Sequence, residues 1–367
     1  PPGRLRRAGR GAAPPGVPDF PAAVSRHKVG RRLETLIFIA IRVSDTVLQG
    51  PDRKANTSPH LTATSPMPQE KPEITGWTAL RGVAALWVVL FHYRDPFTPE
   101  LKSPFFESGY LGVEVFFILS GAVMYYVYEQ DLVDGRFSYR LFLLKRIARL
   151  YPVHLVTALV AAAIIFGLPL VGLREAPPYD LGPALAVNLA MLQSFPFLGG
   201  LSLNYPSWSI SAEFIAYMAF PLLSLILLSF GLRHAILACL ILFGIAEVAA
   251  GKATGQCFSC ELSITHLTYQ FSVFRVIPEF FAGLLGAAIT FRYSEILKGY
   301  AVPALAVSVA AIILGAGLRV DLLVLTAAIP LTMSLALWNG HPPRVFLWLG
   351  RISYSLYMSH VVAKMFL

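Results

Sequence analysis

Two polar residues interrupt an apolar stretch in the first third of the chain. The stretch reads GWTALRGVAALWVVLFHY and carries Arg81 and His92, eleven positions apart. At about 100° per residue, this spacing puts both side chains on one face of a helix, about 16 Å apart along its axis. An imidazole can act as a general base near neutral pH, and a guanidinium can bind an anion. The two groups are too far apart to hydrogen-bond, but they could hold the two ends of one elongated ligand.

The composition indicates which kind of fold must position these residues. The chain has 367 residues, of which 56% are hydrophobic and 14% are charged, and its mean hydropathy is +0.61. Soluble domains carry about 25% charged residues, and repeated apolar runs of about 20 residues predict membrane-spanning helices. We therefore expect an all-α, polytopic integral membrane helical bundle with about nine to ten transmembrane helices. The runs predict spans at about 77–94, 109–128, 150–171, 208–231, 235–250, 271–291, 301–318, 322–338 and from 352 to the end.

Lysine and arginine are concentrated between the expected spans, which predicts the orientation of the chain. They occur in the segment 136–149, at Arg233, at Arg292 and at Arg344. These positions all reach the cytoplasmic side only if the short apolar run 181–195 does not reverse the chain. That run could instead be a re-entrant or interfacial helix. The net charge of +9 lies in these segments and in the N-terminal tail, so it gives no reason to expect nucleic acid as a partner.

Residues 1–72 differ from the remainder in being rich in Pro, Arg, Ser and Thr. Their apolar run, Leu36–Ile41, is far too short to span a membrane. We expect a disordered, basic, Pro-rich tail. The chain starts with Pro, and its last helix stops short of a full crossing. We therefore expect a fragment whose C-terminal helix is truncated.

Two carboxylates are expected near the depth of His92. Glu114 lies about five residues into the second expected span, and Glu213 about five residues into the fourth. A carboxylate bonded to one imidazole nitrogen raises the basicity of the other, as a general base requires. We therefore predict His92, Glu114 and Glu213 as catalytic residues. Alternatively, each acid neutralises an intramembrane arginine, such as Arg81 or Arg275, and His92 is a packing histidine.

Two arginines at the cytoplasmic end of the third span are candidates for binding a phosphate. Arg146 and Arg149 lie in LLKRIARLYP, and the fork of a guanidinium matches phosphate oxygens. The alternative is that they anchor the helix by the positive-inside rule. An anion that enters from the cytoplasm and a base near the outer face together imply transfer of a group across the membrane.

The last expected helix carries Tyr357 and His360 on one face, six and nine residues past Arg351. This places them about 9–14 Å deep, in the inner half and short of His92. We predict that they line the ligand channel. The alternative is that they hydrogen-bond to neighbouring helices.

Six blocks of this sequence resemble, in the same order, the motifs of the acyltransferase 3 family. They are Arg81 with His92, then GVEVFFILSG, KRIARLYP, WSISAEF, RVIPEFFAG and ISYSLYMSH. The resemblance covers 74–360 and implies a transmembrane acyltransferase domain at 73–367. It implies transfer of an acyl group, usually acetyl, from cytoplasmic acyl-CoA to a hydroxyl of a cell-surface carbohydrate or related acceptor. It also implies about ten spans, with 181–195 as one of them, against the charge pattern.

The resemblance assigns roles residue by residue. His92 matches the essential histidine of the family and Arg81 the paired arginine. Glu213 matches the acid of the Trp-Ser-Leu-Ser-x-Glu block, in which Ile210 here replaces Leu. We expect His92 to deprotonate the acceptor hydroxyl, either directly or by way of an acyl-histidine. The residues expected to contact substrate are Arg81, Arg146, Arg149, Trp208, Ser209, Arg275, Tyr357 and His360.

The implied partners are the lipid bilayer, acyl-CoA and a carbohydrate or other hydroxyl acceptor. Acetyl-CoA is expected as the donor substrate, with no permanently bound cofactor and no metal. The expected location is the inner (cytoplasmic) membrane, as a multi-pass protein. The alternative function is a transporter or flippase of a glycan or lipid-linked substrate, in which the same intramembrane charges bind and release cargo. Consumption of acetyl-CoA distinguishes the two.

The three cysteines suggest no catalytic role. Cys257 and Cys260 form a single CxxC pair without a second pair to complete a zinc site. We expect a loop disulfide or two free thiols there, with a metal site that includes His266, six residues on, as the alternative, and we expect Cys239 to pack in the core.

Overall fold

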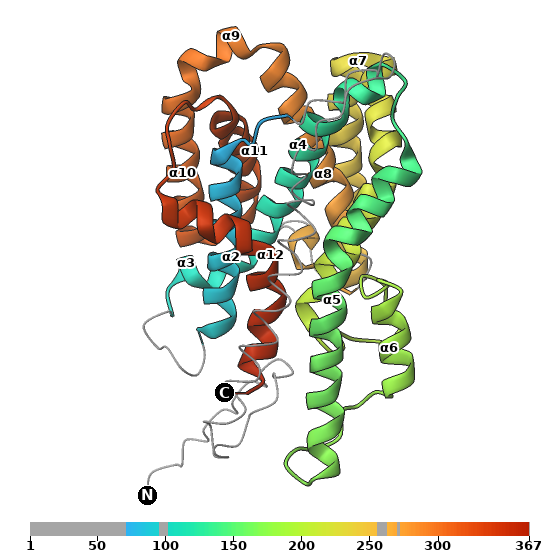
Figure 1. Ribbon diagram of the computed structural model, residues 1–367. Helices are drawn as coiled ribbons and strands as arrows, with labels where there is room; N and C mark the ends of the chain where they lie inside the picture. Colours follow the sequence, from blue (N-terminus) through green and yellow to red (C-terminus); the bar gives the residue numbers. More distant parts are fainter. Residues whose placement is uncertain (1–70, 95–101, 255–262, 270–271, 367) are drawn as a thin grey trace, which may run out of the picture.

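The computed structural model describes residues 71–94, 102–254, 263–269 and 272–366 (Figure 1). Within these ranges the regular structure is helical, with no strand, so the all-α prediction is confirmed for the described part of the chain. Residues 1–70 of the predicted tail lie outside the described residues, as do Cys257 and Cys260. Cys239 is buried, with its Sγ 3.7 Å from the carbonyl oxygen of Pro278, as expected for a packing residue.

The described helices correspond to the predicted spans, but α5 begins 11 residues earlier than predicted and α12 begins eight residues earlier. The longer ones are α2 (Thr75–Tyr93), α4 (Gly112–Val133), α5 (Tyr139–Leu170), α6 (Leu181–Leu189), α7 (Trp208–Thr254), α8 (Val273–Arg292), α10 (Ala301–Leu318), α11 (Asp321–Leu337) and α12 (Arg344–Lys364). Short helical turns connect them: α3 (Pro104–Glu107), η2 (Ser108–Leu111), η3 (Tyr205–Ser207), η4 (Ser263–His266), α9 (Ser294–Leu297) and η5 (Lys298–Tyr300).

Five helical segments in the described ranges are long and apolar enough to cross a membrane. They are Pro104–Val133, Tyr139–Leu170, Tyr205–Lys252, Val273–Arg292 and Ser294–Leu318, and α11 is apolar but shorter. These helices support the prediction of a membrane protein. The predicted count of nine to ten spans is not confirmed by the length and composition of the described helices. Neither α2 nor α12 is among the five. Polar and charged residues inside a membrane bundle are costly and usually functional, and α2 and α12 carry several of the candidate site residues.

Helix α7 reverses direction at Gly231. Its 47 residues would extend about 70 Å as one straight helix, but Gly231 has φ 76° and ψ 172°, which interrupts the helix. Trp208, at the start, stacks on Arg275. Ala250, near the end, packs against Leu267, whose carbonyl oxygen accepts a hydrogen bond from Arg275. Both ends therefore lie near Arg275, and the helix consists of two antiparallel arms, as the separate predicted spans indicate.

Helix α6 does not cross the bundle. It has nine residues, about 14 Å, whereas a crossing needs about 20 residues. Figure 1 shows it at the end of the bundle opposite α9 and the turn of α7. The turn between α4 and α5, the break in α7 and the α9–η5 segment lie at that opposite end (Figure 1), and they carry the basic residues Arg136, Arg233 and Lys298. The arrangement therefore matches the charge pattern, and the resemblance-based expectation that 181–195 spans is wrong.

Small residues let two pairs of helices approach very closely. A Cβ atom at Gly283 of α8 would overlap the carbonyl oxygen of Ile118 of α4, and one at Gly350 of α12 would overlap that of Thr78 of α2. Such contacts are typical of helix pairs in membranes. Thr78 lies beside Gly350, and the Tyr93 hydroxyl donates to the carbonyl oxygen of His360 further along both helices. Helices α2 and α12 are therefore parallel.

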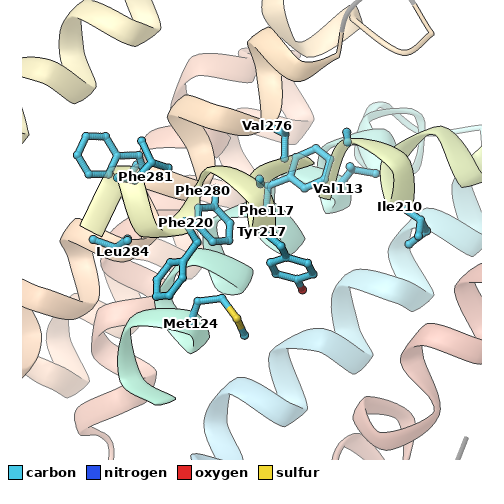
Figure 2. Close-up of a cluster of buried hydrophobic side chains, with 14 of the residues drawn as sticks. Val113, Phe117, Met124, Ile210, Tyr217, Phe220, Val276, Phe280, Phe281 and Leu284 are labelled. Carbon is cyan, nitrogen blue, oxygen red and sulfur yellow. The ribbon is translucent and has the colours of Figure 1, made fainter. Parts of the chain in front are cut away.

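Aromatic side chains fill the core between α4, α7 and α8. Phe117, Phe220, Phe280 and Phe281 are each no more than 2% exposed (Figure 2). The Phe142 ring of α5 stacks on Phe220 at 5.3 Å. This packed core forms a rigid wall for the polar space on its other side.

Candidate active site

A cavity lies between helices α2, α4, α5, α7 and α12. Its empty volume is about 740 Å³, including its opening. Val113, Phe117, Met124 and Tyr217 of the aromatic core form part of its wall (Figure 2). Its polar lining residues are Arg81, Ser120, Arg146, Arg149, Ser209, Glu213, Tyr217, Ser353, Tyr354 and Tyr357.

The cavity carries a positive charge excess at one end. Three of its lining residues are arginines, and Glu213 is the one acidic residue in the described lining. The Glu213 carboxylate accepts short hydrogen bonds from Ser120 and Tyr217. Because one carboxylate faces three guanidinium groups, this end of the cavity favours an anionic ligand.

Two of these guanidinium groups have unused donors. The Nε atoms of Arg81 and Arg146 are buried and have no hydrogen-bond partner in the described structure. The Arg146 guanidinium lies 5.8 Å from the centre of the Tyr217 ring, and its Nη2 is 3.4 Å from the Tyr128 hydroxyl. An unsatisfied buried donor costs about 1–3 kcal/mol. Phosphate oxygens entering the cavity would remove this cost.

His92 lies beside a second histidine. Its Nδ1 is 2.9 Å from the Val88 carbonyl oxygen and 3.1 Å from Nε2 of His360. A carbonyl oxygen can only accept, so Nδ1 of His92 carries a proton. Its Nε2 therefore keeps a lone pair, which is the atom a general base needs. The Tyr205 ring lies 5.5 Å from the His92 ring, and Lys364 donates to the His92 carbonyl oxygen at 2.6 Å.

Tyr357 connects the cavity to the histidine pair. Its side chain lines the cavity, and its hydroxyl lies 2.7 Å from the Ser209 hydroxyl. Its carbonyl oxygen is 2.5 Å from Nδ1 of His360. Neither histidine is among the lining residues in the described structure. The cavity therefore ends close to the pair, with Tyr357 between them, and the arginines and His92 lie toward opposite ends of α2.

The expected meeting of His92 with two carboxylates does not occur. Glu114 makes a short ion pair with Arg275, and a second bond joins Glu114 Oε2 to Arg275 Nε at 3.2 Å. Glu213 lies with the arginines of the cavity instead. No carboxylate hydrogen-bonds to His92 among the described residues. The alternative from sequence, that each acid faces an intramembrane arginine, agrees with this geometry, because a buried guanidinium needs a counter-charge.

The remaining predicted substrate contacts fall into two groups. Arg81, Arg146, Arg149, Ser209 and Tyr357 line the cavity, as the predicted substrate role requires. Arg275 and Trp208 do not line it in the described structure. Arg275 is 2% exposed, its guanidinium lies 5.1 Å from the centre of the Trp208 ring, and both belong to the packed core.

The predicted depth of His360 is wrong. Counted from Arg351, it was expected in the inner half and short of His92, but the two rings are 4.8 Å apart between centres. The reason is the parallel, backbone-to-backbone packing of α2 and α12 at Gly350. This packing sets the register between the two helices, and one charged residue on α12 carries no information about it.

Three residues of the site were not predicted. Ser120 and Tyr217 hold Glu213, and Tyr205 lies against His92. Tyr217 follows Glu213 by four positions, which puts the two on one helix face. That spacing was available from sequence. The positions of Ser120 and Tyr205 depend on how α4 and η3 pack and had no local signal.

Similarity to known proteins identifies the family of this chain. Residues 74–367 match the acyltransferase 3 family, described as "Acyltransferase domain". The chain is 35% identical over 148 residues to "Protein 2 in picA locus" of Rhizobium radiobacter, a match that covers 37% of this chain and 74% of that protein. It is 34% identical over 164 residues to "Acyltransferase MdmB" of Streptomyces mycarofaciens, which covers 42% of this chain and 40% of that protein.

No solved structure matches the chain significantly. The family match covers the helical bundle and includes both the cavity and the histidine pair. The chain therefore belongs to the acyltransferase 3 family and is a membrane acyltransferase.

Proposed function

We propose that this protein transfers an acyl group, acetyl in the simplest case, from cytoplasmic acyl-CoA to a hydroxyl of a cell-envelope carbohydrate or related acceptor. One observation carries the proposal: an arginine-rich cavity with unused buried donors ends next to His92, whose Nε2 has no hydrogen-bond partner among the described residues. We place the enzyme in the inner membrane, with the Arg136 end of the bundle facing the cytoplasm.

In this proposal the arginines bind the phosphate groups of the donor. Arg149 and Arg146 belong to α5 and Arg81 to α2, so two helices contribute guanidinium groups to one end of the cavity. The lining beyond them, which includes Val113 and Phe116, is apolar and suits the pantetheine arm and the thioester. Glu213 holds this arginine group together through its negative charge.

His92 performs the proton transfer. Its Nε2 takes the proton of the acceptor hydroxyl, whose oxygen forms a bond to the thioester carbonyl carbon. The carbon–sulfur bond then breaks, and the leaving CoA thiolate takes the proton from the His92 imidazolium. In a two-step variant, the acyl group passes first to Nε2 of His92 and then to the acceptor.

A transporter or flippase of a glycan is the other function that the sequence suggested. Intramembrane arginines alone are compatible with it. The family membership favours acyl transfer, and acetyl-CoA consumption separates the two, because a transporter leaves the thioester intact.

The test is CoA release by the purified protein in detergent, with acetyl-CoA as donor and a cell-envelope glycan fraction as acceptor. We expect release by the wild-type protein and a loss of about 10²–10⁴-fold in His92→Ala, the usual contribution of a general base. His154→Gln is the matched control, because His154 is also buried and bonds to the Asn188 carbonyl oxygen at 2.9 Å, outside the cavity. Activity of folded His92→Ala near the wild-type level would remove the base assignment.

A further inference from the structure

The hydrogen-bond chain through the two histidines has a defined direction. Nδ1 of His360 lies 2.5 Å from the Tyr357 carbonyl oxygen, which can only accept, so this nitrogen carries a proton. In a neutral ring, Nε2 of His360 then has a lone pair. It faces Nδ1–H of His92 at 3.1 Å and accepts from it. The chain therefore runs from His92 to His360 to the α12 backbone.

On its own, the Val88 carbonyl oxygen would restrict the orientation of the His92 ring only weakly. Val88 precedes His92 by four residues in α2, so its carbonyl oxygen also accepts the regular helical bond from the backbone N–H of residue 92. His360 supplies a second acceptor from a different helix. Two acceptors from two directions restrict the rotation of the His92 ring, whereas one shared acceptor does not.

Among the residues that the structure describes, no carboxylate hydrogen-bonds to either ring of the pair. The polar contacts of the two rings, within the described ranges, are the Val88 carbonyl oxygen for His92, the Tyr357 and Leu356 carbonyl oxygens for His360, and each other. The charged groups nearby are cations: Lys364 donates to the His92 carbonyl oxygen, and Arg94 follows two residues later. His360 is only 4% exposed, so its contact with His92 is shielded from bulk water.

We infer that His360 is a positioning residue for the general base. It holds His92 in the Nδ1–H tautomer with Nε2 free, and it accepts the stronger hydrogen bond that Nδ1–H donates when His92 becomes an imidazolium. This task is usually performed by a carboxylate or a carbonyl oxygen. The inference rests on the proposed function for its catalytic meaning, but the tautomer can be measured without activity.

Two substitutions distinguish the roles of the two ring nitrogens of His360. His360→Asn places an amide near the position of Nδ1, so it can still bond to the Tyr357 carbonyl oxygen, but it has no atom that reaches His92. His360→Gln places an amide near the position of Nε2 and can still accept from His92. Both variants lose the ring, so a general effect of losing a buried imidazole is common to them.

The first measurement is CoA release from acetyl-CoA. We expect kcat to fall about 10- to 100-fold in His360→Asn, part of the full contribution of a general base, with KM for acetyl-CoA within about twofold. We expect His360→Gln to recover most of the wild-type kcat. A merely structural role would lower the yield of folded protein in both variants and would not separate their kcat values. Equal kcat in the two folded variants overturns the inference.

The second measurement is the ¹⁵N spectrum of histidine-labelled protein in detergent, with the His92 signals assigned from His92→Gln. We expect His92 to be protonated on Nδ1 in the wild-type protein and in His360→Gln, and to lose this preference in His360→Asn. An unchanged tautomer in His360→Asn overturns the inference. If the wild-type protein releases no CoA with any acceptor, the proposed function fails, while the spectrum still decides whether His360 positions His92.

Discussion

At the scale of single residues, the structure sorts the buried charges into two kinds. Arg275 is fully enclosed and paired with Glu114, and its guanidinium stacks on Trp208. Breaking such a pair leaves an uncompensated charge, which typically destabilises a protein by about 3–5 kcal/mol. Arg81 and Arg146 line a cavity and keep an unused Nε. The first kind supports the fold, and the second is available to a ligand.

Arg149→Gln tests the arginines of the cavity. A charge-assisted hydrogen bond to phosphate contributes about 1.5–3 kcal/mol, so we expect KM for acetyl-CoA to rise about 10- to 100-fold, with kcat within about threefold. Steady-state CoA release measures both constants. Arg136→Gln is the control, because Arg136 is exposed and pairs with Asp134 at 2.7 Å outside the cavity. An unchanged KM in Arg149→Gln would mean that the donor phosphates do not bind at Arg149.

At the scale of elements, the site depends on the contact between α2 and α12. Their backbones touch at Gly350 and Thr78, one end of the pair, and the histidines meet toward the other. The parallel direction keeps the two helices in contact over this whole distance. A substitution that separates the helices at Gly350 should therefore also displace the two histidines, which lie about 15 Å away along the helix.

Gly350→Ala tests this dependence. The added methyl group would overlap the Thr78 carbonyl oxygen and lie 2.8 Å from the Thr78 Cγ2 atom, so the helices must separate. A displacement of about 1 Å in a catalytic group can cost about 10²-fold in rate. We expect kcat to fall at least about tenfold, together with a lower Tm.

Gly244→Ala is the matched control for this substitution. Gly244 also lies inside a helix, but an added Cβ would meet no atom within 4 Å. Alanine at such a position stabilises a helix by about 0.5–1 kcal/mol. We expect unchanged kcat and an equal or higher Tm. The dependence of the site on helix contact is contradicted if the two variants have the same kcat.

At the scale of the whole molecule, the short helix α6 decides the topology. It lies at one end of the bundle, whereas the basic turns lie at the other (Figure 1). Chain segments on its two sides, after α5 and before α7, therefore lie at the same end of the bundle, and we expect them on the same side of the membrane. This arrangement puts the turns that carry Arg136, Arg233 and Lys298 on one side, in line with the positive-inside rule.

Cysteine labelling tests the topology in a variant whose three native cysteines are replaced by alanine. Leu173 and Phe197 are exposed and flank α6, and Arg136 is exposed at the opposite end. We expect a membrane-impermeant maleimide, added to intact cells, to label Leu173→Cys and Phe197→Cys but not Arg136→Cys. Permeabilised cells should show labelling of all three. If α6 crossed the membrane, positions 173 and 197 would label from opposite sides.

Much of the fold was predictable from the sequence because a membrane limits the choices of a chain. A spanning segment must satisfy its backbone groups internally, so a long apolar run indicates a helix with defined ends. The break at Gly231 and the ends of α2, α10 and α11 follow this rule closely. The spacing of Arg81 and His92 also predicts a shared helix face. These properties depend on local sequence and on the solvent.

The partners of the buried polar residues were decided only by tertiary structure. Glu114 and Arg275 are 161 positions apart in the chain, and His92 and His360 are 268 apart. Helical periodicity tells which face a side chain occupies, but not which helix lies opposite or at what level. That level is set where glycines let two backbones touch, as at Gly350. For this reason the sequence predicted a carboxylate beside His92, and the packing of α12 on α2 placed a histidine there.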